Sequence, residues 1–235
     1  MRYRIFYFFS ISIVFLFLIY FSQKRNSKNK TLTLNVNFKG GKGRFFDSQM
    51  VNKLLIQRGD TTFFFTEDMV DLKVVEDKLT SNAMIAKADI FRTPQGILNV
   101  KVEERKPIIR IINNQEEFYL DNFGYRVPLS KNYSPRVPIF YGNKAENLTT
   151  LVNFVKLIKS DSFAKVEIID IKYHNKSYII GLRSFPFKVV WGDISKFKNK
   201  IKKLKYLYGY LDDKEFLEID QVNLTFDKQI VIGYE

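Results

Sequence analysis

Apolar residues recur at every second position of residues 32–38, where polar residues separate Leu32, Leu34, Val36 and Phe38. This period of two is typical of a strand that buries one face. Two stretches with helical spacing follow, one after Asp47, a predicted N-cap, and one after Thr66. Their apolar faces are formed by Met50, Val51, Leu54 and Leu55, and by Met69, Leu72, Val75 and Leu79.

Residues 85–92 and 97–102 then predict two strands joined by a turn at residues 93–96. The order strand, helix, helix, strand, strand predicts an α+β unit, residues 32–107, in which two helices cover one face of a small sheet. Its last strand runs into Pro107, which cannot donate to a sheet and favours extended geometry in the residue before it. Glu104, Arg105 and Pro107 therefore mark the predicted seam with a second domain.

Residues 108–235 predict a strand-rich mixed domain with an open sheet flanked by helices. One helix is expected around residues 148–158, and a second is expected to begin at Gly192. The predicted strands are residues 108–112, 117–120, 166–172, 178–182 and 187–191, and a final hairpin of residues 219–226 and 229–234.

The N-terminal residues 5–21 carry no charge and are interrupted only by Ser10 and Ser12. At about 1.5 Å per residue they would span roughly 25 Å, near the lower limit for a membrane helix. We predict a cytoplasmic stub and single transmembrane helix in residues 1–22, then a basic polar linker in residues 23–31. An uncleaved anchor is favoured over a signal peptide, because no A-x-A-like site follows. The predicted anchor residues include Ile5, Phe9, Val14, Leu18 and Phe21.

Flanking charges leave the orientation of this helix open. Arg2 and Arg4 precede it, whereas four basic residues lie within residues 24–30. Taken literally, the positive-inside rule would keep the main domains in the cytoplasm, but long domains cross largely regardless of charge.

The formal net charge of +13 comes in large part from residues 24–30 and 196–205. No nucleic-acid partner is predicted, because no reader motif accompanies this charge. The first run abuts the apolar segment, which favours contact with anionic membrane lipid. The second run lies on a predicted helix that buries its opposite face, so its lysines are expected to be solvated.

No catalytic, cofactor or metal site is predicted, and neither is a small-molecule substrate. Gly43 is followed by Arg44 and not by the Lys-Ser/Thr pair of a phosphate-binding loop, so residues 40–43 predict a turn. His174, the only histidine, lies in a polar stretch, and Trp191 at the end of an apolar strand predicts a core position. The absence of cysteine excludes disulfides and thiolate ligands. We expect no enzymatic activity, although an active site assembled from distant residues stays open as an alternative.

An apolar anchor, this order of elements and the closing run Val100-x-Val102-x-Glu104-Arg105-x-Pro107 together resemble the bacterial cell-division family FtsQ, also called DivIB. Three further segments resemble family motifs. They are Tyr119-Leu120-Asp121-x-x-Gly124, residues 138–142 with Val137 in place of the usual leucine, and Glu218-Ile219-Asp220 with Gln221 as a departure. The resemblance implies that residues 32–107 are a POTRA domain, an interaction module, and that residues 108–235 are the C-terminal β domain.

The resemblance also implies a bitopic scaffold that recruits and connects divisome proteins at the septum. Its domains would lie outside the cytoplasmic (inner) membrane, on the periplasmic side, and its expected partners are FtsB and FtsL. The alternative is a POTRA-bearing accessory of outer-membrane protein assembly or secretion. That alternative is disfavoured, because the strands after Pro107 are too few for the β-barrel that usually accompanies such units.

A partner segment can add as a strand to the open edge of a sheet. The C-terminal hairpin is the predicted docking edge, with side chains Leu224, Phe226, Ile230, Ile232 and Tyr234.

Overall fold

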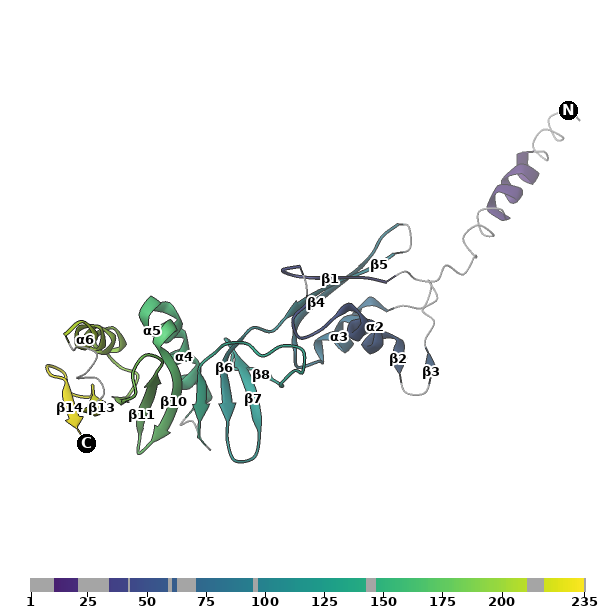
Figure 1. Ribbon diagram of the computed structural model, residues 1–235. Coiled ribbons are helices and arrows are strands. Elements are labelled where there is room, and N and C mark those ends of the chain that lie inside the picture. The colour runs from purple at the N-terminus through teal and green to yellow at the C-terminus, as the bar shows by residue number, and fades with distance from the viewer. Residues whose placement is uncertain are drawn as a thin grey trace, which may run out of the picture.

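The computed structural model describes residues 11–20, 34–41, 43–58, 61–62, 71–94, 97–142, 147–210 and 218–234. Within these residues the strands form a three-stranded sheet and a nine-stranded sheet, together with one short separate hairpin (Figure 1). Each of the two larger sheets has its own hydrophobic core. We call the two parts the small unit, up to residue 104, and the large unit, from residue 107 onward. The α+β class with a strand-rich sheet and helices is confirmed, whereas the domain boundaries stay a prediction.

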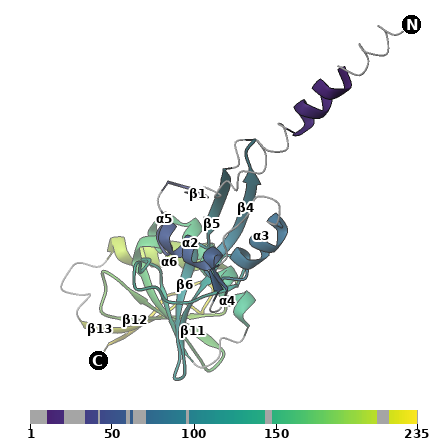
Figure 2. The same cartoon turned by 90° about the vertical axis from the view of Figure 1, so that its right-hand side faces the viewer.

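The central strand of the small unit is β5, which pairs in parallel with β1 and antiparallel with β4. The two helices α2 and α3 pack on one face of this sheet (Figure 2). The short β2–β3 hairpin between them was not predicted, because strands of two residues carry no apolar period. The elements are β1 (Leu34–Phe38), α2 (Ser48–Ile56), β2 (Gln57–Arg58), β3 (Thr61–Thr62), α3 (Leu72–Thr80), β4 (Ile85–Arg92) and β5 (Leu98–Glu104).

Side-chain caps fix the starts of both helices in the small unit. The carboxylate of Asp47 accepts a hydrogen bond from the backbone N–H of Met50 at 2.7 Å, which confirms the predicted N-cap. α3 begins after Asp71, whose carboxylate accepts from the N–H of Lys73 at 2.9 Å. The predicted start after Thr66 lies outside the described residues.

The strands of the large unit follow the order β14-β13-β12-β11-β10-β9-β6-β7-β8 across the sheet. The pairs β9–β10 and β12–β13 are parallel, so each needs a crossover, and helices supply both. The elements are β6 (Pro107–Ile112), β7 (Glu117–Asp121), β8 (Arg126–Val127), β9 (Ile139–Tyr141), α4 (Leu148–Ser160), α5 (Ser162–Glu167), β10 (Ile168–His174), β11 (Ser177–Leu182), β12 (Lys188–Gly192), α6 (Phe197–Tyr210), β13 (Ile219–Asn223) and β14 (Val231–Tyr234).

One face of the large sheet is buried under its helices. Buried and more exposed residues alternate along β11 and β12, as they do in a sheet with one covered face. Trp191 is fully buried, and its ring lies 5.7 Å from that of Phe154 on α4 and 5.4 Å from that of Phe197 on α6. The predicted core position of Trp191 is therefore confirmed.

Several predicted boundaries are wrong. The helix expected to begin at Gly192 begins at Phe197, because Gly192 still belongs to β12, and the strand expected from Gln229 begins at Val231. A polar side chain explains two further errors. The strand expected from Val166 begins at Ile168, because the carboxylate of Asp161 accepts from the N–H groups of Phe163 and Ala164 and starts α5.

The strand expected to reach Phe226 ends at Asn223. There the Asn223 side chain accepts hydrogen bonds from the N–H of Thr225 at 2.9 Å and from its hydroxyl at 2.7 Å. This local turn draws the chain out of the ladder.

Residues 11–20 form a helix. Among the residues with a described placement, no helix is both long enough and apolar enough to cross a membrane. Val14 and Leu18 lie exposed on this helix, whereas Ile5, Phe9 and Phe21 fall outside the described residues. The transmembrane anchor therefore stays a prediction.

Replacing Phe154 with alanine should destabilise the large unit by about 3–5 kcal/mol, because it removes a buried ring from the aromatic cluster around Trp191. Urea denaturation of the full chain in detergent, followed by the fluorescence of its single tryptophan, measures this loss. Lys156→Ala, an exposed change on the same helix, should stay within about 0.5 kcal/mol of the parent. An equal loss in both variants would contradict the packing described here.

Candidate functional site: the seam and the terminal edge strand

Glu104, the last residue of β5, binds a tight turn of the small unit. Its carboxylate accepts hydrogen bonds from three successive backbone N–H groups, those of Arg44, Phe45 and Phe46, at 2.8–3.0 Å. Gly43 permits this turn, since a Cβ there would lie 2.0 Å from the carbonyl oxygen of Phe46. The turn that follows Gly43 is thus closed by a carboxylate.

Arg105, the next residue, binds the large unit. Its guanidinium donates to the carboxylate of Asp121 at 2.9 Å and lies 4.3 Å from the centre of the Tyr125 ring. The side chains of Arg105 and Asp121 are only 16% and 3% exposed. Asp121 also accepts the N–H groups of Phe123 and Tyr125, both at 2.9 Å, so this buried carboxylate is well satisfied.

The seam is therefore held on both sides by adjacent residues. Glu104 fastens the chain to the small unit, Arg105 fastens it to the large unit, and Pro107 opens β6 opposite Asp121. A proline is tolerated at this first strand position. Glu104 and Arg105, which mark the predicted seam, are thus both engaged in specific hydrogen bonds.

Asp121 and the turn of residues 44–46 are seam components that the sequence analysis did not assign. Asp121 was noted only as part of a motif that resembles the family, and no role was predicted for it. A signal was available, because an acidic residue in an otherwise apolar strand end requires a buried partner.

A second contact reinforces the seam from the loop after β8. The ring of Tyr133 meets that of Phe45 edge-on at 5.2 Å between centroids, and its hydroxyl accepts from Arg44 at 3.3 Å. Aromatic pairs of this geometry contribute about 0.5–1.5 kcal/mol beyond their burial. The large unit thus reaches back onto the turn that Glu104 organises.

The terminal strand β14 is one edge of the nine-stranded sheet and lies at the end away from the small unit (Figure 1). It pairs antiparallel with β13, with Ile232 opposite Val222 and Tyr234 opposite Ile219. Its other side faces no strand among the residues that the structure describes. Within the described ranges the backbone groups on that side have no neighbouring strand, and an edge of this kind can accept an added strand.

The five predicted docking side chains are placed differently. Leu224 is buried, so it belongs to the core and not to an exposed surface. Phe226 lies half-exposed after the end of β13, and Ile230 precedes β14 while packing partly on the core. Ile232 also packs partly on the core, and Tyr234 is 62% exposed.

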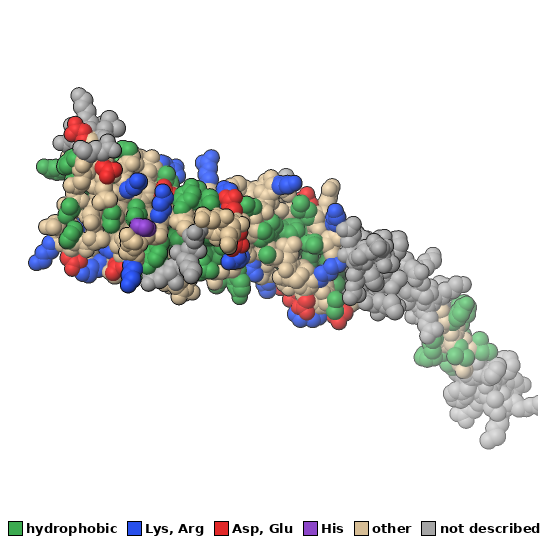
Figure 3. All heavy atoms as spheres, turned by 90° about the horizontal axis from the view of Figure 1, so that it is seen from below, with side chains coloured by type: hydrophobic (Ala, Val, Ile, Leu, Met, Phe, Trp, Pro, Cys, Tyr) green, Lys and Arg blue, Asp and Glu red, His purple; other side chains and the backbone are tan. Residues whose placement is uncertain are grey.

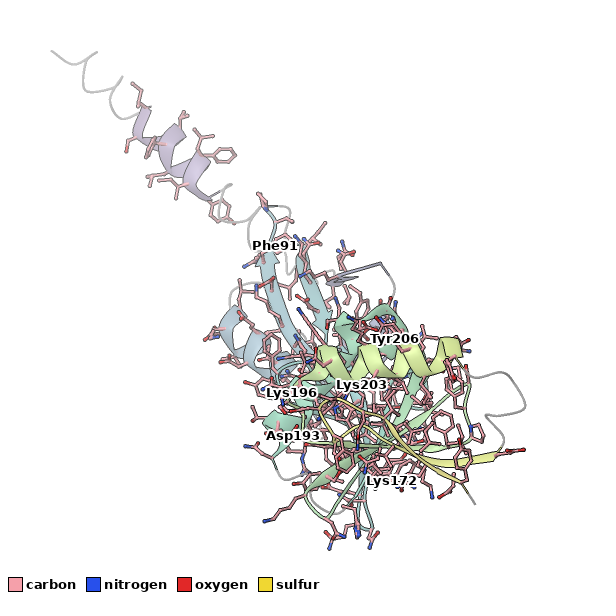
Figure 4. The ribbon with its side chains drawn as sticks, turned by 90° about the vertical axis from the view of Figure 1, so that its left-hand side faces the viewer. Phe91, Lys172, Asp193, Lys196, Lys203 and Tyr206 are labelled. Carbon is pink, nitrogen blue, oxygen red and sulfur yellow. The ribbon has the colours of Figure 1, made fainter. Side chains whose placement is uncertain are left out.

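Lysines of α6 and of the turn before it hold the β13–β14 turn. Lys196 donates to both carboxylate oxygens of Asp227, at 2.7 and 2.6 Å, and Lys203 donates to the carbonyl oxygens of Phe226 and Gln229. Figure 4 shows Lys196 and Lys203 on the side of α6 where the hairpin lies. The expectation that this lysine run is solvated is wrong for Lys200, which is buried and donates to the carbonyl and carboxylate oxygens of Asp193 at 2.8 and 3.1 Å. Lys196 holds the turn while its side chain stays 54% exposed.

The hydrogen bond and charge of Lys196 lower the pKa of Asp227 below its usual value. A carboxyl with a lowered pKa contributes stability that is present at neutral pH and is lost only as the pH falls through that lowered value. The contact between α6 and the turn should therefore persist at neutral pH and weaken only in acid.

Groups for catalysis do not converge in the part of the chain described here. No cluster of three or more His, Cys, Asp or Glu side chains that could hold a metal occurs within the described ranges. His174 is exposed, next to the turn of Asn175 and Lys176. Figure 3 shows one face of the molecule, on which charged and apolar side chains are interspersed over both units.

The fold and the seam define a two-unit α+β protein. A small sheet covered by two helices is joined to a large sheet through a buried ion pair, and the terminal strand of the large sheet is an edge strand. The sequence comparison then gives the family. The model for "FtsQ/DivIB, C-terminal related" matches residues 106–233, which is more than half of the chain, and the chain belongs to this family. The predicted relationship is thus confirmed.

The chain is also similar to the cell division protein FtsQ of Rhodothermus marinus, with 31% identity over 75 residues. The matched segment is 31% of this chain and 28% of that protein, so the chain matches much less than two thirds of the relative's length. Membership of the family suggests a role in cell division.

Replacing Arg105 with alanine should loosen the seam and cost about 3 kcal/mol, because Asp121 would keep a buried charge without its cation. The chain has no cysteine, so spin labels can be placed on cysteines introduced at Lys87 and Lys188. The distance distribution between the labels, measured by pulsed electron paramagnetic resonance, should broaden in Arg105→Ala.

Lys106→Ala serves as the control, since Lys106 is exposed and adjacent. A narrow distribution in the Arg105→Ala chain would show that the ion pair does not set the angle between the units.

Proposed function

We propose that this protein is a membrane-anchored scaffold of the bacterial divisome, which recruits and connects division proteins at the septum through protein–protein contacts. The family match and the name of the Rhodothermus relative support the division role. The resemblance supports a single-pass position in the cytoplasmic membrane with the two units outside it. FtsB and FtsL are the expected partners, and membrane lipid surrounds the anchor.

The open outer side of β14 is the observation that carries the proposed mechanism. A partner segment that adds there as a strand satisfies backbone groups of the edge, while alternate side chains supply specificity. Tyr234 and the exposed Val231 lie on this strand, and aromatic side chains are frequent anchors of interfaces.

The contacts of α6 suit this role, because strand addition needs an edge that is ordered before the partner arrives. Lys196 and Lys203 restrain the turn that leads into β14. A preformed edge avoids part of the entropic cost of binding.

The membrane anchor would contribute to binding by raising the local concentration of partners. Confinement to a membrane raises the effective concentration of partners that share it, so individual contacts can be modest in affinity. The proposed protein therefore acts by binding and not by catalysis.

Of Ile232→Pro and Gly233→Pro, the change that removes an N–H group from the open side of β14 should weaken co-purification of FtsB and FtsL with the full chain by about tenfold or more. Consecutive residues of a strand point their N–H groups to opposite sides, so one of the two prolines removes a donor from the open side of β14. The fluorescence of Trp191 reports whether the large unit stays folded.

Ile232→Thr keeps the backbone amide and the β-branched shape, and should retain most of the partner. Full recovery of partners with both proline variants would rule out β14 as the docking strand.

A functional fusion to a fluorescent protein that matures outside the cytoplasm should give a band of signal at mid-cell. This result requires both extracytoplasmic units and recruitment to the division site. A fusion truncated after residue 31 tests whether the anchor alone suffices. Signal spread through the cytoplasm would contradict the proposed topology.

A further inference from the structure

The groove between the small and large units is a second surface with the chemistry of a binding site. It has a volume of about 800 Å³ and is lined by α2, the end of α3 and the loop of residues 128–132. It lies on the helix-bearing side of the small unit, at its junction with the large unit. Its volume falls within the range usual for binding pockets.

The interior of this groove is apolar. Phe46 is nearly buried at its base, and Leu54 and Met84 are partly buried there. Met50 of the small unit and Leu129 of the large unit also line the groove and are 40% and 39% exposed. Two of the four methionines of the chain thus line it, and methionine side chains adapt readily to the shape of a partner.

The rim of the groove is cationic. Lys53 on α2, Lys78 on α3 and Lys131 in the loop come from three separate elements, and none of the described lining residues is acidic. An apolar floor with lysines around it complements a polypeptide segment that carries an apolar row flanked by Asp or Glu.

A membrane surface fits this groove less well. A planar bilayer cannot reach a floor recessed between two folded units, where Phe46 is only 7% exposed.

We propose that the groove between α2, α3 and residues 128–132 binds an acidic, amphipathic segment of a partner polypeptide. The segment contacts both units at once, so it stabilises one angle between them. This surface is separate from the edge strand β14, and its occupant need not be the one that docks there.

The test places a photo-crosslinking amino acid at Leu129 of the full chain in its native membrane, with Leu157 as the control position. Leu157 has similar exposure, 37%, but lies on α4. Mass spectrometry of the adduct should find a segment of another polypeptide, with apolar residues flanked by Asp or Glu, from Leu129 and not from Leu157.

Charge reversal tests whether the lysines of the rim recognise the acidic residues of the segment. The double change Lys53→Glu and Lys131→Glu should reduce the adduct about tenfold or more, whereas Lys53→Arg with Lys131→Arg should retain it. Retention by the arginine variant shows that a charge effect, and not misfolding, causes the loss.

Four results would overturn the proposal: no adduct, an adduct to lipid, an adduct to a basic segment, or an adduct that survives charge reversal. The adduct should persist in the Ile232→Pro chain, since β14 lies at the far end of the large sheet. Loss of the adduct in the Ile232→Pro chain would contradict a separate surface. If the adduct persists and the proline variants still bind FtsB and FtsL normally, the result counts only against the β14 mechanism.

Discussion

The buried pair of Arg105 and Asp121 is the interaction on which the arrangement of the two units depends. Arg105 lies in the short connection between β5 and β6, and it directly follows Glu104, whose carboxylate binds the turn of residues 44–46. A buried ion pair contributes little net free energy compared with an apolar contact, but breaking one partner is costly. The pair therefore acts as a constraint on geometry more than as a source of stability.

This constraint supports both of the proposed binding surfaces. The groove between the units exists only when the small unit and the loop of residues 128–132 hold a defined separation. The edge of β14 lies at the far end of the large sheet, and it is connected to β6 at the seam through β13, β12, β11, β10 and β9. A partner at either surface would thus bind to one continuous framework.

Much of the fold was predictable because its signals are local. The alternation in residues 32–38, the cap at Asp47 and the apolar run of β11 each specify an element within a few residues. The start of α5 at Asp161 and the end of β13 at Asn223 were missed, since a single polar side chain overrode the apolar pattern. The seam shows the limit most clearly: Glu104 and Arg105 could be located, but their partners lie 58–60 residues before and 16 residues after them. Likewise, Leu224 has the apolar character of a docking residue, and only tertiary structure shows that it is buried.

The parallel pairing of β1 with β5 has a consequence for the order of folding. β1 finds its partner only after the chain reaches residues 98–102, and the turn at residues 44–46 remains without its acceptor until Glu104 exists. Closing such a long loop is slow compared with forming a hairpin. The large sheet, in contrast, can start from the β6–β7–β8 meander beside the seam and add strands outward. Among the described strands of this sheet β14 is the last in chain order, so it can pair only after β13 and the strands that support β13 have been made.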